Sequence, residues 1–153
     1  MAIIIRDLKK YKSYISKIKK KITLTSGCFD LFHYGHAKFL NEASKLSDFF
    51  IVALNSDISI KKIKGKKRPI ISLKNRLGLL SSLNFIDIII IFDEETPFEI
   101  IKITKPYYFV KGGDYKKLDN NLKIFSLYCK KIKLLNFVKG LSTSNIINSI
   151  KKI

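Results

Sequence analysis

The sequence predicts an α/β protein built on one doubly wound, mostly parallel sheet of about five strands. Short, continuous apolar runs, typical of strands buried on both faces, alternate with segments whose apolar residues recur at helical spacing. No repeat or linker interrupts the 153 residues, and 46% of them are hydrophobic. A chain of this length and composition buries enough apolar surface for one core without disulfides. We therefore expect a single domain over residues 1–153.

The expected elements follow one another in a regular order along the chain. Residues 1–20 have the apolar spacing of an amphipathic helix that packs on the domain. The lysine-rich stretch 56–70 lacks periodicity and is expected to be a basic loop. Thr96, Pro97 and Glu99 have the spacing of a capping box. The expected strands are 22–25, 49–54, 86–92, 107–110 and 132–137. The other expected helices are 35–47, one from 73 onward, one from the capping box to about 104, 122–131 and 142–150.

The charge balance points to anionic ligands without choosing among them. Thirty Lys and Arg against 12 Asp and Glu give a net charge of +18, which attracts nucleotides, RNA or anionic lipid. An AT-rich genome would also produce this excess of Lys, so a compositional origin stays open. Two cysteines and no apolar run near the ~18 residues that span a bilayer argue against export and membrane insertion. We expect a cytoplasmic protein with no membrane partner and no specific nucleic-acid partner.

The strongest chemical signal follows the strand at 22–25. Residues 27–36 read Gly-Cys-Phe-Asp-Leu-Phe-His-Tyr-Gly-His. His33 and His36 are three residues apart at an expected helix start, where unpaired N–H groups and the helix dipole favour anions. Gly35 would let a phosphate approach the backbone, and the glycine at position 27 would permit a tight turn. The segment therefore predicts a polyphosphate-binding loop.

Two other interpretations of the histidines are open. With Cys28 they could form half of a zinc site, but a closed site needs four ligands and Cys129 is expected in the middle of a helix. They could also be ordinary core residues, although the chain has only two histidines and both fall in one loop. The phosphate interpretation is favoured, and no metal ligand is predicted.

The segment His33-Tyr34-Gly35-His36 resembles the signature of the H-x-G-H nucleotidyltransferase superfamily, whose members have a Rossmann-like, cytidylyltransferase-like fold. Further segments, in order and spacing, resemble the adenylyltransferase domain of ADP-heptose synthase over nearly the whole chain. These segments are Asn55-Ser56-Asp57, Lys64-Gly65 with Arg68-Pro69, Arg76, Glu95-Thr96-Pro97, Val110-Lys111-Gly112-Gly113-Asp114-Tyr115 and 141–147.

The resemblance implies a reaction and its participants. AMP passes from ATP, with Mg²⁺, to a heptose 1-phosphate and gives ADP-heptose and pyrophosphate for the lipopolysaccharide core. The sugar phosphate attacks the α-phosphorus in line, so the protein mainly positions anions and neutralises charge. Many relatives carry a sugar kinase on the same polypeptide, and 153 residues have no room for it. The implied partners are therefore a separate sugar kinase and phosphatase, and a homodimer is considered.

The resemblance also implies roles for individual residues. His33, His36 and Lys64 are the implied catalytic residues. The implied ATP-binding residues are Cys28, Phe29, Asp30, Gly35, Lys61, Gly112, Gly113, Asp114, Ser142, Thr143 and Ser144. The implied sugar-phosphate residues are Asp57, Arg68 and Arg76. Salt bridges for Asp57 and Arg76, and helix capping for residues 142–144, are open alternatives.

The chain departs from the family pattern at Ser26, Ser47 and Tyr107, where Asn, Gly and Asp are usual. The first departure adjoins the histidine loop and bears on sugar specificity. The enzymatic alternatives are a cytidylyltransferase for glycerol 3-phosphate and an FAD synthetase. A basic RNA-binding module is the alternative of another class, and it would leave the two histidines without a role.

Overall fold

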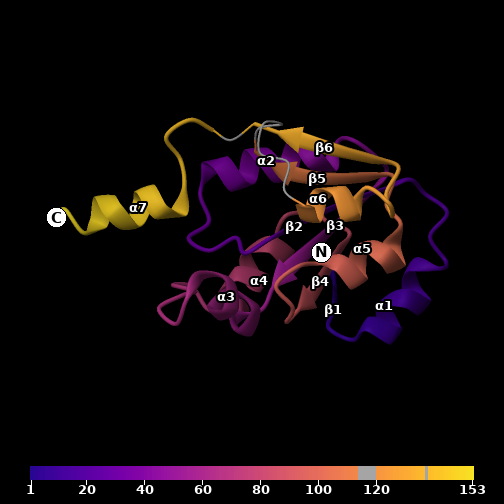
Figure 1. The fold of residues 1–153 in the computed structure, drawn as a ribbon, viewed down its shortest axis with the longest axis horizontal. Coiled ribbons are helices and arrows are strands. Elements are labelled where there is room, and N and C mark those ends of the chain that lie inside the picture. The colour runs from indigo at the N-terminus through magenta and orange to yellow at the C-terminus, as the bar shows by residue number, and fades with distance from the viewer. Residues whose placement is uncertain (114–119, 137) are drawn as a thin grey trace.

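The computed structural model describes residues 1–113, 120–136 and 138–153 (Figure 1). Within these residues, six strands form one sheet in the order β1-β4-β3-β2-β5-β6, and every neighbouring pair is parallel. The strands are β1 (Ile3–Ile5), β2 (Ile22–Gly27), β3 (Phe49–Asn55), β4 (Ile88–Phe92), β5 (Tyr108–Gly112) and β6 (Lys131–Leu135). The predicted parallel α/β sheet is confirmed, with one strand more than expected.

Helices cover both faces of the sheet. Buried residues of α1, α5 and α6 pack in one cluster with the strands, and those of α2 and α4 pack in a second cluster. The helices are α1 (Leu8–Ile15), α2 (Tyr34–Ser44), α3 (Asp57–Lys64), α4 (Leu73–Ser81), α5 (Phe98–Thr104), α6 (Asn120–Phe125) and α7 (Thr143–Ile150). The fold is therefore doubly wound, as the alternation of strands and helices predicts. None of the described helices is long and apolar enough to cross a membrane.

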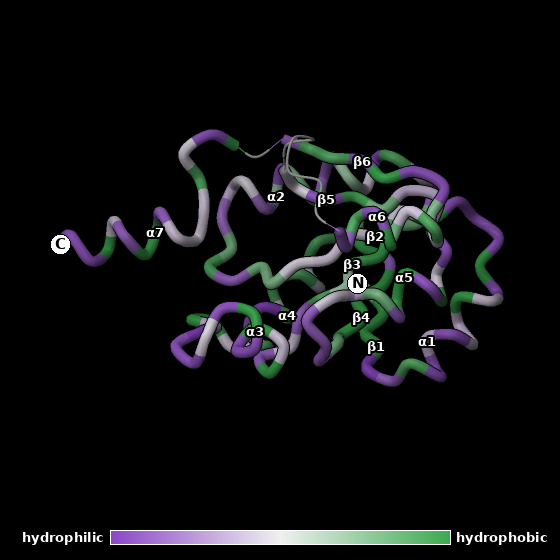
Figure 2. The backbone as a smooth tube through the Cα atoms, viewed as in Figure 1, coloured by the Kyte–Doolittle hydropathy of each residue, from purple (hydrophilic) through white to green (hydrophobic). Residues whose placement is uncertain are grey.

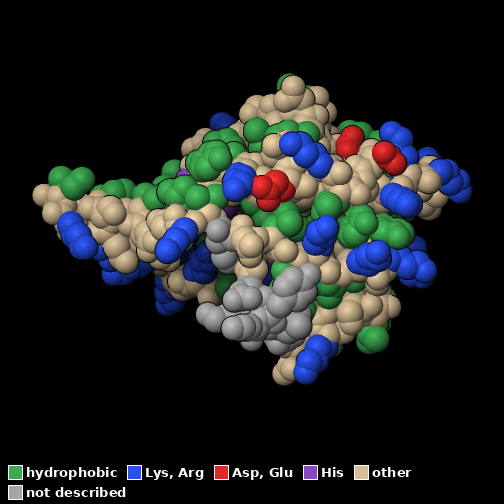
Figure 3. All heavy atoms as spheres, turned by 90° about the horizontal axis from the view of Figure 1, so that it is seen from above, with side chains coloured by type: hydrophobic (Ala, Val, Ile, Leu, Met, Phe, Trp, Pro, Cys, Tyr) green, Lys and Arg blue, Asp and Glu red, His purple; other side chains and the backbone are tan. Residues whose placement is uncertain are grey.

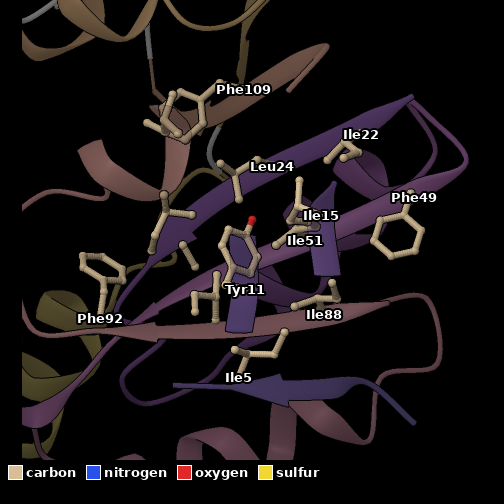
Figure 4. Close-up of a cluster of buried hydrophobic side chains, with 14 of the residues drawn as sticks. Ile5, Tyr11, Ile15, Ile22, Leu24, Phe49, Ile51, Ile88, Phe92 and Phe109 are labelled. Atoms are coloured by element: carbon tan, nitrogen blue, oxygen red, sulfur yellow. The ribbon is translucent and has the colours of Figure 1, made fainter. Parts of the chain in front are cut away.

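The core lies between the sheet and its helices. All seven residues of β3 are buried, and the central strands form the green interior of the tube in Figure 2. Tyr11 of α1 lies over Leu24 and Ile51 of the central strands (Figure 4). Its hydroxyl shares a hydrogen bond of 2.6 Å with Oγ1 of Thr104, which satisfies a polar group inside the core. This packing makes the sheet a rigid base for the loops at its carboxyl edge.

The N-terminal segment differs from the predicted helix over residues 1–20. Three consecutive isoleucines, Ile3–Ile5, form β1 and pair with β4 at the edge of the sheet. The helix begins only after Asp7, whose carboxylate accepts the N–H of Lys10 at 2.7 Å, and it ends at Ile15. β-branched residues fit a pleated strand better than a helix, so the three isoleucines form a strand and the helical pattern starts only at Leu8.

The predicted basic loop at 56–70 is wrong in its first half, which forms α3. The hydroxyl of Ser56 accepts the N–H of Ser59 at 3.1 Å and caps the helix, and Ile60 is fully buried. Gly65, with a φ of 90°, ends the helix in a conformation that favours glycine. The many lysines on the exposed side conceal this short amphipathic pattern in the sequence.

Two further helix boundaries are corrected. The N-cap of α5 is Pro97 and no side chain caps it, so the predicted capping box at Thr96 does not form. Helix α6 ends at Phe125, six residues before the end expected for 122–131, and Cys129 lies in the segment that leads to β6. The expected position of this cysteine inside a helix was therefore also wrong.

The direction in which successive strands are added to the sheet reverses beside β2. The chain adds β3 and then β4 on one side of β2, and later adds β5 and β6 on the other side. In open α/β sheets, ligands bind at the carboxyl ends of the strands where the order reverses in this way. The histidine loop follows β2 at this point. The fold therefore places the predicted phosphate-binding loop at the ligand-binding edge of the sheet.

Candidate active site

A cleft of about 630 Å³ opens at the carboxyl ends of β2 and β5. Its walls come from the loop after β2, the last residue of α3, the end of β5 and the turn that begins α7. Helix α7 continues from the cleft away from the body of the domain, and none of its side chains is buried (Figure 1). Segments separated by more than 100 residues thus meet around one space.

The structure gathers most of the predicted ATP and catalytic residues around this cleft. The cleft is lined by Cys28, Phe29, Asp30, His33, Gly35, His36, Lys64, Gly112, Ser142, Thr143 and Ser144. Lys61 is exposed and does not line it, and Gly113 follows β5 just outside the lining. Asp114 lies outside the described residues. Asp57, Arg68 and Arg76 lie behind the loop rather than on the cleft wall.

His33 and His36 form a stacked pair at the start of α2. His33 is the N-cap of the helix, and the two imidazole rings stack with centroids 3.9 Å apart. The backbone N–H of His33 donates to Nδ1 of His36 at 3.4 Å. In the neutral form of His36 the proton is therefore on Nε2, which leaves Nε2–H as a hydrogen-bond donor. Phe29 and Phe32 pack against the same ring, each with centroids 5.4 Å away.

Two glycines permit this arrangement by their lack of a side chain. A Cβ on Gly35 would lie 2.9 Å from the ring of His33, so only glycine leaves the stacked pair undisturbed. A Cβ on Gly27 would lie 2.9 Å from the ring of Phe29. The backbone of Gly27 is not left-handed, so the expected reason for this glycine, a tight turn, is replaced by close packing against an aromatic ring.

Burial keeps both histidines neutral in the ligand-free protein. Burial first, and then the neighbouring His33 and the charge of Lys64, together lower the pKa of His36 to about 4, against a smaller opposing effect of Asp30. Burial also lowers the pKa of His33. At neutral pH the pair therefore offers N–H donors, and the fixed positive charge beside it belongs to Lys64. A bound polyphosphate would favour the protonated imidazoles and raise both pKa values.

The depressed pKa of His36 predicts acid sensitivity of folding. Between pH 6.5, the ordinary pKa, and about 4, the unfolded chain binds a proton that the folded protein excludes. The free energy of unfolding should therefore fall as the pH decreases through this window. Urea unfolding of the wild type and of His36→Asn at several pH values between 7 and 4 tests this. The variant should show the weaker pH dependence, and equal slopes for the two proteins would contradict the assignment.

Asp30 organises the loop that carries the histidines. Its carboxylate accepts hydrogen bonds from Nε and Nη2 of Arg68 at 2.8 and 2.6 Å and from the N–H groups of residues 70–71, both at 2.9 Å. Burial alone would raise the pKa of Asp30, but these donors hold it below its usual value. Phe29 and Leu31 on either side have left-handed backbones, with φ of 47° and 48°. The carboxylate thus holds a strained loop in place.

Arg76 joins several loops beneath the cleft. It is 3% exposed, and its guanidinium donates to the carbonyls of Cys28, Asn55 and Ile71 at 2.7, 2.8 and 3.0 Å and to the carboxylate of Asp57 at 2.7 Å. These contacts favour the salt-bridge alternative for Asp57 and Arg76 over direct contact with a sugar phosphate.

The hydroxyl groups at the start of α7 have different contacts. Ser142 is the N-cap and accepts the N–H of Asn145 at 3.1 Å, which is the capping alternative left open above. Thr143 donates to the carbonyl of Asp30 at 2.8 Å and thereby ties α7 to the histidine loop. Ser144 lines the cleft, and no hydrogen bond from its side chain to a described residue is present.

The cleft is positively charged. Lys64, Lys111 and Lys139 line it, and none of them forms a hydrogen bond or ion pair through its ammonium group with a described residue. Asp30 is the acidic residue in the described lining, and its oxygens are already occupied. Figure 3 shows one face of the molecule with many basic and few acidic side chains. Lys111 directly precedes the glycines of a segment that carries the family resemblance, but neither it nor Lys139 was among the individual site residues that the sequence predicted.

A doubly wound sheet with a basic cleft over its point of reversal, and with two histidines at a helix N-terminus, defines a nucleotidyltransferase. The sequence model of the cytidylyltransferase-like family matches residues 24–149, so the chain belongs to that family. The match includes all the segments that line the cleft, and it confirms the resemblance seen in the sequence.

Individual relatives agree with this assignment. The chain is 45% identical over 148 residues to "Bifunctional protein HldE" of Helicobacter pylori strain G27, covering 97% of this chain and 31% of that protein. It is 42% identical over 146 residues to the protein of the same name from Aliarcobacter butzleri, covering 95% and 30%. The chain thus spans about a third of the length of the curated relatives it matches.

Two solved structures share the fold. A lipopolysaccharide core biosynthesis protein from Thermoplasma volcanium superposes with a TM-score of 0.64 at 27% identity, covering 78% of this chain and 99% of that one. Pantoate-beta-alanine ligase from Francisella tularensis superposes with a TM-score of 0.68 at 18% identity, covering 100% and 79%. The second likeness concerns the fold alone.

Proposed function

We propose that this domain transfers AMP from ATP to a heptose 1-phosphate and releases ADP-heptose and pyrophosphate. The observation that carries the proposal is the stacked pair of His33 and His36 at the N-terminus of α2, in a cleft with unpaired lysines. Support comes from the family match and from the similarity to two HldE proteins over nearly all of this chain. The name of the Thermoplasma structure places that relative in lipopolysaccharide core synthesis.

The reaction is a single displacement at the α-phosphorus of ATP, which transfers the AMP group. An oxygen of the sugar phosphate forms a new bond to the α-phosphorus of ATP, and the bond from that phosphorus to the bridging oxygen breaks. Pyrophosphate leaves with the electron pair, so no proton acceptor is required. Nε2–H of His36 and the ammonium group of Lys64 would donate to phosphate oxygens as negative charge moves across the phosphoryl group. The N-terminus of α2 adds partial positive charge at the same place.

Magnesium would arrive with the nucleotide. The described residues contain no group of three or more His, Cys, Asp or Glu side chains that could hold a metal ion, and the carboxylate of Asp30 is already occupied. Mg²⁺ usually keeps several waters and binds substrate phosphates. The proposed substrate is the magnesium complex of ATP, and His36 and Lys64 would act on its phosphate oxygens.

Gly112, Gly113 and Asp114, at and after the end of β5, would bind ribose and adenine. A sugar kinase and a phosphatase would make and prepare the heptose phosphate, and the transfer would take place in the cytoplasm. We propose that residues 1–153 act as one domain, with a second copy of the chain as the candidate partner.

The proposal predicts which substrates the purified protein uses. With ATP, Mg²⁺ and heptose 1-phosphate it should release pyrophosphate at least tenfold faster than with CTP, or with glycerol 3-phosphate as the acceptor. The measurement is continuous detection of pyrophosphate over a panel of nucleotides and acceptors. Preference for CTP with glycerol 3-phosphate, or for FMN as acceptor, would replace the proposal by one of the alternative nucleotidyltransferase reactions.

A further inference from the structure

Lys111 differs from the other two lysines of the cleft by its position on a strand. It is the fourth residue of β5 and is half-buried, whereas Lys64 and Lys139 are exposed. Its ammonium group forms no hydrogen bond or ion pair with a described residue. Removing a charge from water is unfavourable unless an opposite charge compensates for it. A half-buried, unpaired cation on a cleft wall therefore points to an anionic ligand.

The sheet order places Lys111 across the histidine loop from Lys64. The loop follows β2, and β2 lies between β3 and β5. Lys64 ends the helix that follows β3, and Lys111 lies on β5. The positive charge of Lys64 acts to lower the pKa of both Cys28 and His36, so Lys64 lies beside the histidine pair. The two lysines therefore flank the loop from opposite sides.

Nucleotidyl transfer brings anionic groups to both sides of the reacting phosphorus. The attacking and leaving oxygens lie roughly in line, with the phosphorus between them. In the proposed reaction the leaving group is pyrophosphate and the attacking group is the phosphate of the sugar. A site with a cation on one side only would leave one of these groups unneutralised.

We propose that Lys111 binds the phosphate of the acceptor sugar, while Lys64 and the histidines bind the phosphates of ATP. This inference rests on the proposed transfer to a phosphorylated acceptor, and it adds a binding residue on the acceptor side. The positive charge of Lys111 then makes the site select an acceptor that carries a phosphate. Arg68 and Arg76, which the resemblance implied for the sugar phosphate, already donate hydrogen bonds to carboxylates of the protein. The role of binding the sugar phosphate therefore goes to Lys111.

Lys111→Met tests the proposal because methionine keeps an unbranched side chain and removes the charge. Charge-assisted hydrogen bonds to phosphate contribute enough that the KM for heptose 1-phosphate should rise about 10- to 100-fold. The KM for ATP, and ATP binding measured by calorimetry, should stay within about twofold. Lys111→Arg should recover part of the affinity for the acceptor. Lys133→Met, an exposed position on the neighbouring strand β6, changes the net charge equally and should have no effect.

The outcomes separate this inference from the proposed function. If the wild type uses a different phosphorylated acceptor, the same comparison is made with that acceptor and still decides the role of Lys111. A matching rise in the KM for ATP, or unchanged values for both substrates, would overturn the inference while leaving the transfer reaction in place. Calorimetric titration with heptose 1-phosphate adds a test without turnover. Wild-type binding that Lys111→Met weakens supports the inference, and equal binding by both proteins contradicts it.

Discussion

His36→Ala should lower kcat by about 10²- to 10³-fold, with a much smaller change in the KM for ATP. The side chain offers a donor that the backbone N–H of His33 and the packed aromatic rings orient in advance. Negative charge on the phosphoryl oxygens grows as the sugar phosphate attacks, so such a donor acts more strongly on the transition state than on bound ATP. Steady-state kinetics with pyrophosphate detection provide both constants.

Two companion variants make this result interpretable. His33→Ala removes the other ring of the stacked pair and should produce a loss of similar size. Lys123→Ala, on the exposed side of α6 and away from the cleft, should leave both constants unchanged. Circular dichroism should show that all three variants are folded. Wild-type kcat in His36→Ala, or activity that is lost only together with a bound zinc ion, would remove the phosphate role of the histidine loop.

Arg76→Met should have the largest effect on stability, a loss of about 3–5 kcal/mol in the free energy of unfolding. The guanidinium supplies donors to three carbonyls and one carboxylate, and it is almost completely buried. Methionine fills part of the volume and leaves these acceptors without a donor. Arg76→Lys should also be destabilising, because one ammonium group cannot reach acceptors arranged around a planar guanidinium. Urea unfolding at neutral pH measures both.

The matched control is Arg6→Met, since Arg6 is exposed and forms no ion pair with a described residue. It should change the free energy of unfolding by less than about 0.5 kcal/mol. A similarly small effect at Arg76 would show that the loops are held by other contacts. Its role would then be reconsidered in favour of the sugar phosphate, which KM measurements on the folded variant would reveal.

Local patterns in the sequence determined the fold class and the position of the histidine loop. Strands β3 and β4 are continuous apolar runs because both of their faces are covered. Such runs can be recognised in the sequence without a structure. The motif with His33 and His36 directly follows a strand and starts a helix, so its place at a carboxyl edge follows from the order of elements. Conversely, α3 was missed because lysines on its exposed side dominate its composition, and β1 because three residues carry little periodicity.

Only the tertiary structure decided which charged residues face the cleft. The resemblance implied Arg68 and Arg76 for the sugar phosphate and did not single out Lys111, because charge and spacing alone do not show what each side chain contacts. Folding brings Asp30 against Arg68 across 38 residues of sequence. It also brings the carbonyls of Cys28 and Asn55 and the carboxylate of Asp57 against Arg76, across 19 to 48 residues. Those contacts engage the two guanidinium groups and leave Lys111 free on the cleft wall. The physical reason is that hydrogen-bond partners are set by long-range packing, which local periodicity does not encode.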